Sequence, residues 1–319
     1  MRLWFGVPAS KQPNLCAMSN TEQQISRVND ALHVIHRDIS ADLTAKHLAN
    51  VAAYSEQHFH RVFKQVVGET INVYIRRTRL EHAANQLMFN QQSRIIDIAE
   101  KCGFSSLSSF THSFRDTFKT TPAKWRMVNR SHVNPPYLLD PEIAAGHQRV
   151  ANTKIITPKL LVLEDIHVAY VRHKGYGREI SRAWQALRSW AISQGRRFDQ
   201  HGIDGIKSSG QQIGLHHSNP EWVALEECHY VACLSIDQPL VRRGVVNGLT
   251  IPGGLHAMFK LKGQYGDLLP LIGNILKQWL PTSGYTLQTT PAVLHYHKNH
   301  LLEADEQFDI DLYLPISTV

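Results

Sequence analysis

Apolar residues in the first part of the chain recur at the period of an α-helix, in short segments separated by polar turns. Within residues 55–68 the apolar positions follow the spacing i, i+3, i+4 and i+7, which marks one face of a helix: Phe59, Val62, Phe63 and Val66. Ser55 is a suitable N-cap for this helix, and Gly68 is a suitable residue to end it. Residues 43–54 show a shorter pattern of the same kind. The two segments together predict a helix-turn-helix unit.

The same arrangement occurs a second time further along the chain. Phe110 and Phe114 lie 51 residues after Phe59 and Phe63, and they follow another short apolar segment that ends in a glycine. Between the two copies, the apolar pattern over residues 71–88 predicts one longer helix. We therefore expect an all-α domain in which two helix-turn-helix units are held at a fixed separation.

Positive charge is concentrated in this helical part. Residues 21–130 contain 15 Lys and Arg against 10 Asp and Glu, whereas residues 151–319 contain 16 against 15, within a formal net charge of +7. A basic domain with polar helix faces is suited to double-stranded DNA. For a single unit, an ordinary solvated helix face would explain the polar residues equally well. The tandem repeat favours DNA binding.

The pattern changes after a segment with three prolines at residues 131–150. Beyond it, alternating apolar and polar positions are typical of strands at residues 230–236, 291–297 and 308–316. Residues 168–191 and 255–280 each combine a strand, a glycine turn and an amphipathic helix, and their matching positions lie 88 residues apart. We expect an α+β domain with an internal pseudo-twofold repeat. The seam between its halves is a suitable place for a cleft.

The chain of 319 residues is long enough for two domains, each with its own core. The patterns divide it into a tail (1–20), a helical domain (21–130), a linker (131–153) and an α+β domain (154–319). No apolar run reaches the ~20 residues of a membrane-spanning helix, so no membrane partner is expected.

Both helix-turn-helix units contain long motifs of a known kind. These are LANVAAYSEQHFHRVFKQVVGETINVYI and IIDIAEKCGFSSLSSFTHSFRDTFKTTPAKWR. On these motifs, residues 24–130 resemble the DNA-binding domain of AraC/XylS-type transcription regulators. The resemblance implies a domain of seven helices that inserts two recognition helices into successive segments of the major groove.

The resemblance also implies which side chains meet DNA. Base contacts are expected from seven residues: Gln57, His60, Arg61, Leu107, Ser108, Thr111 and His112. Phosphate contacts are expected from four: Ser55, Lys64, Arg115 and Lys119. Arg suits guanine and Gln suits adenine, whereas Ser and Thr discriminate little between bases. We expect the first unit to set the target sequence and the second mainly to hold the protein on the DNA.

Four motifs connect the second half to another family: VAYVRHKGYGREI, IPGGLHAMFKLKGQYGDL, QWLPTSGY and FDIDLYLPI. They resemble the GyrI-like effector-binding domain attached to some AraC-type and MerR-type regulators. The resemblance implies an aromatic pocket for lipophilic, often cationic, small molecules, with a carboxylate opposite the cation. The candidates are Trp184, Trp222, Tyr265, Tyr296 and Tyr313, with Asp311 as the carboxylate. Two alternatives stay open: Trp184 also fits a core position, and Asp311 could face water.

The cysteines and a histidine-rich segment of the chain are candidate metal ligands. No C-x-x-C pair or zinc-ligand spacing connects the four cysteines, which fit buried thiols in a reducing cytoplasm: Cys16, Cys102, Cys228 and Cys233. In the segment HYHKNH, His295 and His297 would share one face of a strand, with His300 in the following turn. No carboxylate or cysteine nearby in the sequence completes a ligand set. We therefore expect neither a metal nor a cofactor.

The resulting prediction is a cytoplasmic, sequence-specific DNA-binding regulator of transcription, which binds a small effector and works with RNA polymerase. The runner-up is a GyrI-like hydrolase, which needs a carboxylate (Glu226, Glu227 or Asp311) beside a tyrosine in the pocket. A fused DNA-repair methyltransferase would need an activated cysteine. No catalytic sequence motif supports either enzyme.

Overall fold

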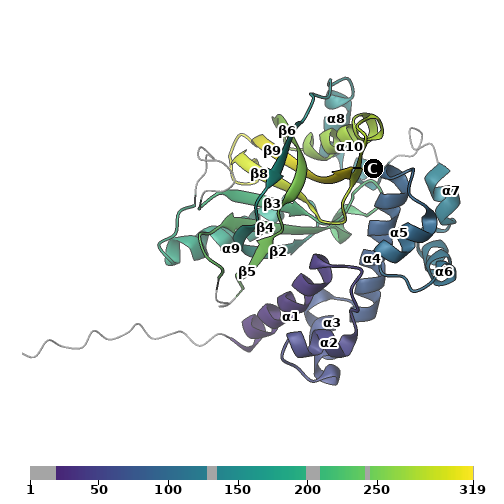
Figure 1. The fold of residues 1–319 in the computed structure, drawn as a ribbon. Helices are drawn as coiled ribbons and strands as arrows, with labels where there is room; N and C mark the ends of the chain where they lie inside the picture. Colours follow the sequence, from purple (N-terminus) through teal and green to yellow (C-terminus); the bar gives the residue numbers. More distant parts are fainter. Residues whose placement is uncertain (1–18, 128–134, 199–208, 241–244, 319) are drawn as a thin grey trace, which may run out of the picture.

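A helical domain and a sheet domain pack against each other in the computed structural model (Figure 1). The structure describes residues 19–127, 135–198, 209–240 and 245–318. No helix within these ranges is both long enough and apolar enough to cross a membrane.

The helical domain has seven helices over its described residues, the number that the resemblance to AraC/XylS-type regulators implied. They are α1 (Asn20–Arg37), α2 (Ala45–Val51), α3 (Glu56–Val67), α4 (Ile71–Phe89), α5 (Ile95–Lys101), α6 (Leu107–Phe118) and α7 (Pro122–Met127). Helices α2 and α3 form the first helix-turn-helix unit, and α5 and α6 form the second. The long helix α4 joins them.

Each unit is built on a row of buried aromatic rings. In the first unit the rings of Phe59 and Phe63 lie 5.5 Å apart. In the second unit Phe110 and Phe114 show the same 5.5 Å separation. All four side chains are fully buried. Between α5 and α6, Gly103 adopts a φ of +78°, a left-handed conformation that glycine reaches without strain. The apolar stripes of the sequence therefore form the cores of both units.

Helix α4 differs from its sequence pattern in two respects. Val73, counted among its apolar pattern residues, is 41% exposed. Two of its arginines support the fold and are not free positive charges. Arg77 forms ion pairs with Glu69 and Glu81, both at 2.6 Å. Arg79 donates hydrogen bonds to backbone carbonyls in the segment after α1.

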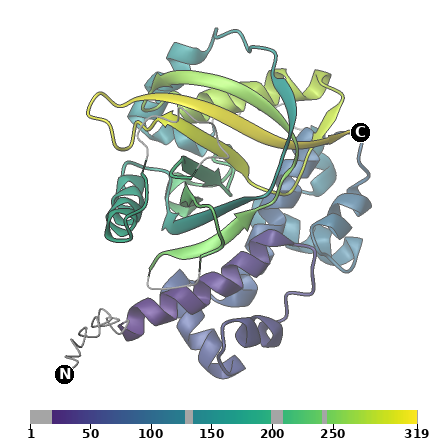
Figure 2. The same ribbon diagram turned by 60° about the vertical axis from the view of Figure 1, so that its left-hand side comes forward.

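The second domain is built on one nine-stranded antiparallel sheet. Its strands are β1 (Lys159–Leu163), β2 (Ile166–Lys174), β3 (Gln212–His216), β4 (His229–Ser235), β5 (Asn247–Ile251), β6 (Gly254–Gln264), β7 (Tyr285–Leu287), β8 (Ala292–Lys298) and β9 (Gln307–Thr318). They follow the order β1-β6-β9-β8-β3-β4-β2-β5, with β7 paired to β9. Leu163 at one end of the sheet and Ile251 at the other belong to one buried cluster. The sheet is therefore strongly curved (Figure 2).

Two amphipathic helices cover the other face of this sheet. They are α9 (Ile180–Ser193) and α10 (Leu268–Gln278), and short 3₁₀ segments lie at Leu225–Glu227 and Leu280–Thr282. The first residues of α9 and α10 are matching positions of the sequence repeat, which agrees with the pseudo-twofold arrangement. The turn of the second copy differs from the prediction: Gly263 lies within β6, and Gly266 carries the positive φ of +92°.

The segment predicted as a linker contains folded elements. A 3₁₀ turn (Pro136–Leu139) leads into α8 (Pro141–Val150), and Asp140 caps this helix through the backbone N–H groups of its first turn. Ile143 and Val150 are buried. Helix α8 packs on α10, so the described part of residues 131–153 belongs structurally to the sheet domain.

Direct contacts fix the two domains relative to each other. Ser26 of α1 donates a hydrogen bond to Asn247 of β5, at 2.8 Å. The ring of Trp125 in α7 lies 5.8 Å from that of Trp222 in the sheet domain. Helix α4 also runs along the sheet domain, close to β7. Helices α1, α4 and α7 therefore dock the helical domain on the sheet domain.

Candidate functional site

Helix α3 presents a polar face that is open to solvent. Gln57, Arg61 and Lys64 are exposed, and His60 is partly exposed. Neither Arg61 nor Lys64 has an acidic partner among the described residues. The helix begins at Ser55, whose hydroxyl accepts a hydrogen bond from the third N–H group of the first turn, at 3.4 Å. The side chains expected to read bases from α3 therefore lie on one unobstructed surface.

Helix α6 presents a smaller and partly self-paired face. Leu107 is 42% exposed, and the serines beside it are exposed. His112 Nδ1 lies 3.0 Å from Asp116 Oδ2. Lys119 ends the helix in a left-handed conformation and donates from Nζ to the backbone carbonyl of Asp116, at 2.7 Å. Thr111 is partly exposed and Arg115 is exposed. A carboxylate thus stands among the side chains expected to meet DNA.

The six residues expected to bind the effector do not line one cavity. Trp184 is fully buried against Tyr296, with their rings 5.6 Å apart, in the core under α9. Trp222 lies between the domains, near the rings of α4 and α7. Asp311 and Tyr313 are on the opposite face of the sheet from Tyr296. Tyr265 and Tyr296 alone share a cavity.

That cavity, here called the seam cavity, lies between the two repeats. It encloses about 430 Å³ including space open to solvent, and its lining includes Tyr176, Tyr230, Tyr265, Tyr296, His300 and Ile143. Ile143 comes from α8. A Cβ added to Gly146 of α8 would lie 2.2 Å from the carbonyl oxygen of Gly266, so the helix backbone contacts the second turn directly. Helix α8 therefore covers one side of the seam cavity.

Ion pairs hold α8 in this position. Arg149 of α8 pairs with Asp267 at 2.7 Å, and Arg178 pairs with Glu142 at 2.7 Å. The guanidinium of Arg178 also lies 4.0 Å from the centre of the Tyr265 ring. This ring face is consequently already occupied by a cation.

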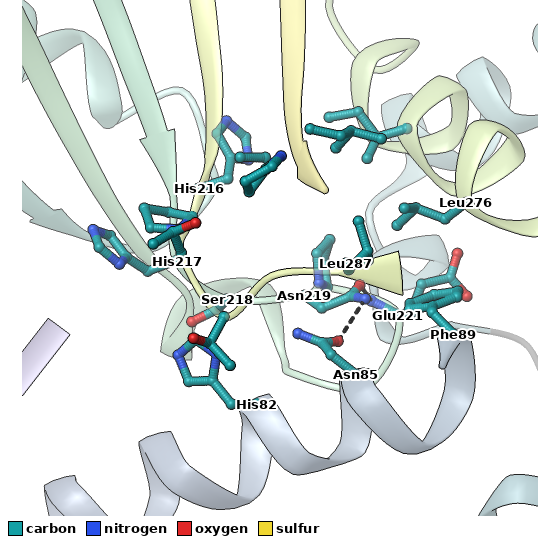
Figure 3. A pocket seen from close by; sticks show the side chains of 18 of the residues that line it. His82, Asn85, Phe89, His216, His217, Ser218, Asn219, Glu221, Leu276 and Leu287 are labelled. Carbon is teal, nitrogen blue, oxygen red and sulfur yellow. Dashed lines mark hydrogen bonds between the residues drawn. The ribbon is translucent and has the colours of Figure 1, made fainter. Parts of the chain in front are cut away.

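A larger cavity, here called the interdomain cavity, lies between α4 and the sheet domain (Figure 3). It encloses about 850 Å³ including space open to solvent. Four of its lining residues come from one face of α4: His82, Asn85, Gln86 and Phe89. Figure 3 labels three of them, His82, Asn85 and Phe89. The segment after β3 faces them, and Asn219 of that segment donates a hydrogen bond to Asn85 at 3.0 Å. The remaining walls come from α10 and from residues 287–292.

The interdomain cavity is apolar on one side and polar on the other, where its one carboxylate among the described residues is paired with a lysine. Its apolar lining includes Phe89, Leu269, Ile272, Leu276, Leu287 and Leu314. Burial lowers the pKa of His82 to about 4 and that of His216 to about 3, so both rings are neutral at pH 7. The Glu221 carboxylate pairs with Lys277 at 2.9 Å. No unbalanced charge is therefore found among the described groups that line this cavity.

The sequence interpretation missed the interdomain cavity. Its residues come from a helix assigned to one domain and from loops assigned to the other. One signal was present: His82, Asn85 and Gln86 lie in the second half of α4 on positions that a single-domain pattern leaves to solvent, yet Gln86 is buried. Buried amides and imidazoles on a helix that joins two reading units indicate contact with another domain.

The groups needed for the two enzymatic alternatives are placed unfavourably. Glu226 and Glu227 are exposed and line neither cavity. Burial raises the pKa of the Cys102 thiol to about 12, which suppresses its nucleophilic thiolate form. Cys228 and Cys233 are also buried, and burial raises the pKa of both thiols. Cys16 lies outside the described residues.

Comparisons with known proteins agree with both halves of this architecture. A GyrI-like small molecule binding domain matches residues 157–317, and a helix-turn-helix domain matches residues 48–127. The probable transcription factor PqrA of Proteus vulgaris is 41% identical over 101 residues, which are 31% of this chain and 82% of PqrA. The transcriptional activator AarP of Providencia stuartii is 30% identical over 135 residues, 42% of this chain and 98% of AarP.

A solved structure is similar to the helical domain alone. It is an AraC-type transcriptional regulator from Chromobacterium violaceum, 27% identical, with a TM-score of 0.31 over 34% of this chain and 95% of that one. The two domain matches together account for both reading units and the sheet domain. The chain belongs to the AraC/XylS-type transcription regulators and carries a C-terminal GyrI-like small-molecule binding domain.

Proposed function

We propose that a lipophilic effector binds in the interdomain cavity and thereby controls how this regulator holds DNA. One observation carries the proposal: a wall of the cavity is α4, the helix that joins the two reading units, and the other walls belong to the GyrI-like domain. A ligand that fits the cavity in only one arrangement of the domains shifts the population toward that arrangement. The effector would then act on both units through one rigid element.

The proposed reading surface consists of the exposed faces of α3 and α6. Base contacts come from Gln57, His60, Arg61, Leu107, Ser108, Thr111 and His112. Phosphate contacts come from Ser55, Lys64, Arg115 and Lys119, which orient the protein without selecting a sequence. The unobstructed α3 face supports the assignment of most sequence discrimination to the first unit.

The lining favours a lipophilic effector over a cationic one. The Glu221 carboxylate already has a lysine partner, and the nearby imidazoles are neutral. A molecule with an apolar body and a small hydrogen-bonding head matches this lining, because burying an unpaired charge there would be costly.

The seam cavity is the second candidate effector site. Tyr265 and Tyr296 support it, because both were expected at the effector site and both line this cavity. Ile143 of α8 is part of the lining of the seam cavity. A ligand larger than a small fragment would therefore fit only if α8 moved. Asp311 and Tyr313 take no part in either cavity.

A pair of blocking variants separates the two sites. Thr290→Trp places a large side chain at the interdomain cavity, and Leu301→Trp does the same at the seam cavity. Both positions lie in loops and are partly exposed, so each indole can be accommodated. Thermal-shift titration of the full chain would use n-alkyl alcohols of increasing length and the matching trimethylammonium compounds.

We expect the alcohols to stabilise the wild type, with an effect that grows with chain length and is lost in Thr290→Trp only. If the stabilisation by the alcohols is lost in Leu301→Trp only, the effector site is the seam cavity. Stabilisation by the ammonium series alone would overturn the choice of ligand class. Footprinting on genomic DNA with and without the active compound then tests regulation, and discrete protected sites that do not change would contradict it.

Two further parts of the proposal concern the cellular setting. AarP carries the description of a transcriptional activator, and a chain with the same reading domain is proposed to act likewise, by contacting RNA polymerase in the cytoplasm. We also propose that the GyrI-like domain binds its ligand without converting it, which the positions of Glu226 and Glu227 support. Turnover of a bound compound would reverse this assignment.

A further inference from the structure

Two histidines and a carboxylate meet on the sheet face that α9 and α10 leave uncovered. His295 of β8 lies directly opposite Asp311 of β9 in the antiparallel register. His297 follows two positions later on the same strand. Its Nε2 is 2.8 Å from Asp311 Oδ2, and the two imidazole rings are 4.6 Å apart. One potential ligand atom from each of the three residues lies within 4.8 Å of the other two.

Strand β8 carries an irregularity at His297. Tyr296 pairs with Ile310 and Lys298 pairs with Asp309, so the register shifts at His297. Such a bulge places an additional residue in one strand and re-aims its side chain. At this point of the strand, His297 Nε2 is within hydrogen-bond distance of Asp311 Oδ2. The sequence predicts no metal site because no carboxylate lies near the two histidines in the sequence. Asp311, predicted as the carboxylate of the effector pocket, lies beside them on the neighbouring strand.

Two buried polar atoms of the group have no hydrogen-bond partner among the described residues. They are His295 Nδ1 and Asp311 Oδ1. His295 is 0% exposed to solvent and Asp311 is 8% exposed. His295 Nε2 is 3.1 Å from Gln211 Oε1, which can only accept, so this nitrogen carries the proton and Nδ1 keeps its lone pair. An imidazole that donates one N–H to a carbonyl and presents the other nitrogen is the usual arrangement of a metal-binding histidine.

From this geometry we propose that His295, His297 and Asp311 form a site for a divalent transition-metal ion. Two imidazoles and one carboxylate suit Zn²⁺, Co²⁺ or Fe²⁺, and bonds of about 2.0–2.2 Å are within reach after small side-chain rotations. On binding, His297 changes to the tautomer that carries its proton on Nδ1, and Nε2 becomes a ligand. The side chain of His297 is 29% exposed, which leaves the ion a path from solvent. The site is separate from the effector cavities, neither of which contains these residues.

Binding of Co²⁺ and Zn²⁺ to the full chain tests the site. The protein is first dialysed against a chelator and then titrated with Co²⁺, and the visible absorption of the bound ion is followed. We expect one equivalent to bind to the wild type and to be displaced by Zn²⁺. Asp311→Asn preserves the shape of the side chain and should weaken binding at least tenfold, and His297→Gln should do the same.

His112→Gln serves as the matched control. His112 also pairs with a carboxylate, that of Asp116, but it is exposed and has no second imidazole beside it among the described residues. Its loss should leave Co²⁺ binding unchanged. Thermal unfolding without metal establishes that each variant is folded, and Zn²⁺ should raise the midpoint only where the site is intact. Equal Co²⁺ affinity in wild type and Asp311→Asn, or no spectrum from the wild type, would overturn the proposal.

Discussion

The two helix-turn-helix units are built alike inside and differ outside. Each is anchored by a pair of fully buried phenylalanines whose rings are 5.5 Å apart. On α3, Arg61 is exposed and has no acidic partner in the described chain, whereas on α6 the His112 imidazole is paired with Asp116. The repeat therefore preserves the packing that forms the fold and varies the surface that would select DNA.

The helices beside the two units also differ in how they contact the sheet domain. Beside the first unit the contacts are polar: Arg77 of α4 donates a hydrogen bond to His229 at 2.9 Å, and the ring of His36 in α1 lies 4.3 Å from that of His217. Beside the second unit the contacts are aromatic, with Trp222 packed near Phe89 of α4 and Trp125 of α7. Ligand or pH effects on docking are therefore expected to act more strongly on the first unit.

The largest expected effect comes from removing a core ring in either unit. Phe59→Ala and Phe110→Ala should each lower the free energy of unfolding by about 3–5 kcal/mol, because each removes a fully buried ring and leaves a cavity. Urea denaturation of the full chain measures both. Similar losses would support the matched interiors. A loss under about 1 kcal/mol in one unit would show that its core is loosely packed.

Acid should weaken the polar docking of the first unit. Burial lowers the pKa of His82 to about 4 and that of His229 to about 3, and it also lowers the pKa of His36 and His217. Arg77 donates to His229 Nε2 at 2.9 Å, a bond that requires the neutral ring. The unfolded chain therefore binds more protons between about pH 6.5 and pH 4, and stability is lost as the pH falls through this window.

For His82 alone the loss is on the order of 3 kcal/mol by pH 4. Urea denaturation at several pH values between 7.5 and 4.5 measures it, and His82→Gln should reduce the pH dependence. An unchanged dependence in that variant would place the acid-sensitive groups elsewhere.

The sequence predicted those parts of the molecule that depend on local patterning. Helical periodicity located both reading helices, and alternation located β2, β4, β6, β8 and β9. The cavities could not be predicted in this way, because their walls join segments far apart in the chain. Asn85 and Asn219, for example, meet across the domain boundary. The sequence predicts Asp311 as the carboxylate of the effector pocket, whereas its histidine neighbours follow only from the strand register.

A smaller effect is expected at the reading surface. Arg61→Ala should weaken binding to a cognate site by about 1–3 kcal/mol and relax one base preference, because an exposed, unpaired guanidinium can bind guanine through two hydrogen bonds. Ser108→Ala on α6 should cost about 1 kcal/mol or less. Fluorescence anisotropy with cognate and scrambled DNA measures both. Equal losses on the two DNAs for Arg61→Ala would assign this residue to the phosphate backbone.

The smallest effect is expected from Asp116→Asn, which should raise the affinity for DNA where the preceding variants lower it. The carboxylate of Asp116 holds the exposed His112 at 3.0 Å and places a negative charge on the face of α6. Its removal frees the imidazole and reduces repulsion from DNA phosphates, so affinity should rise by less than about fivefold. The gain should appear on cognate and scrambled DNA alike and should shrink as salt is added. An affinity that falls instead would mean that the ion pair orients His112 for a base contact, and the second unit would then discriminate sequence as the first is expected to do.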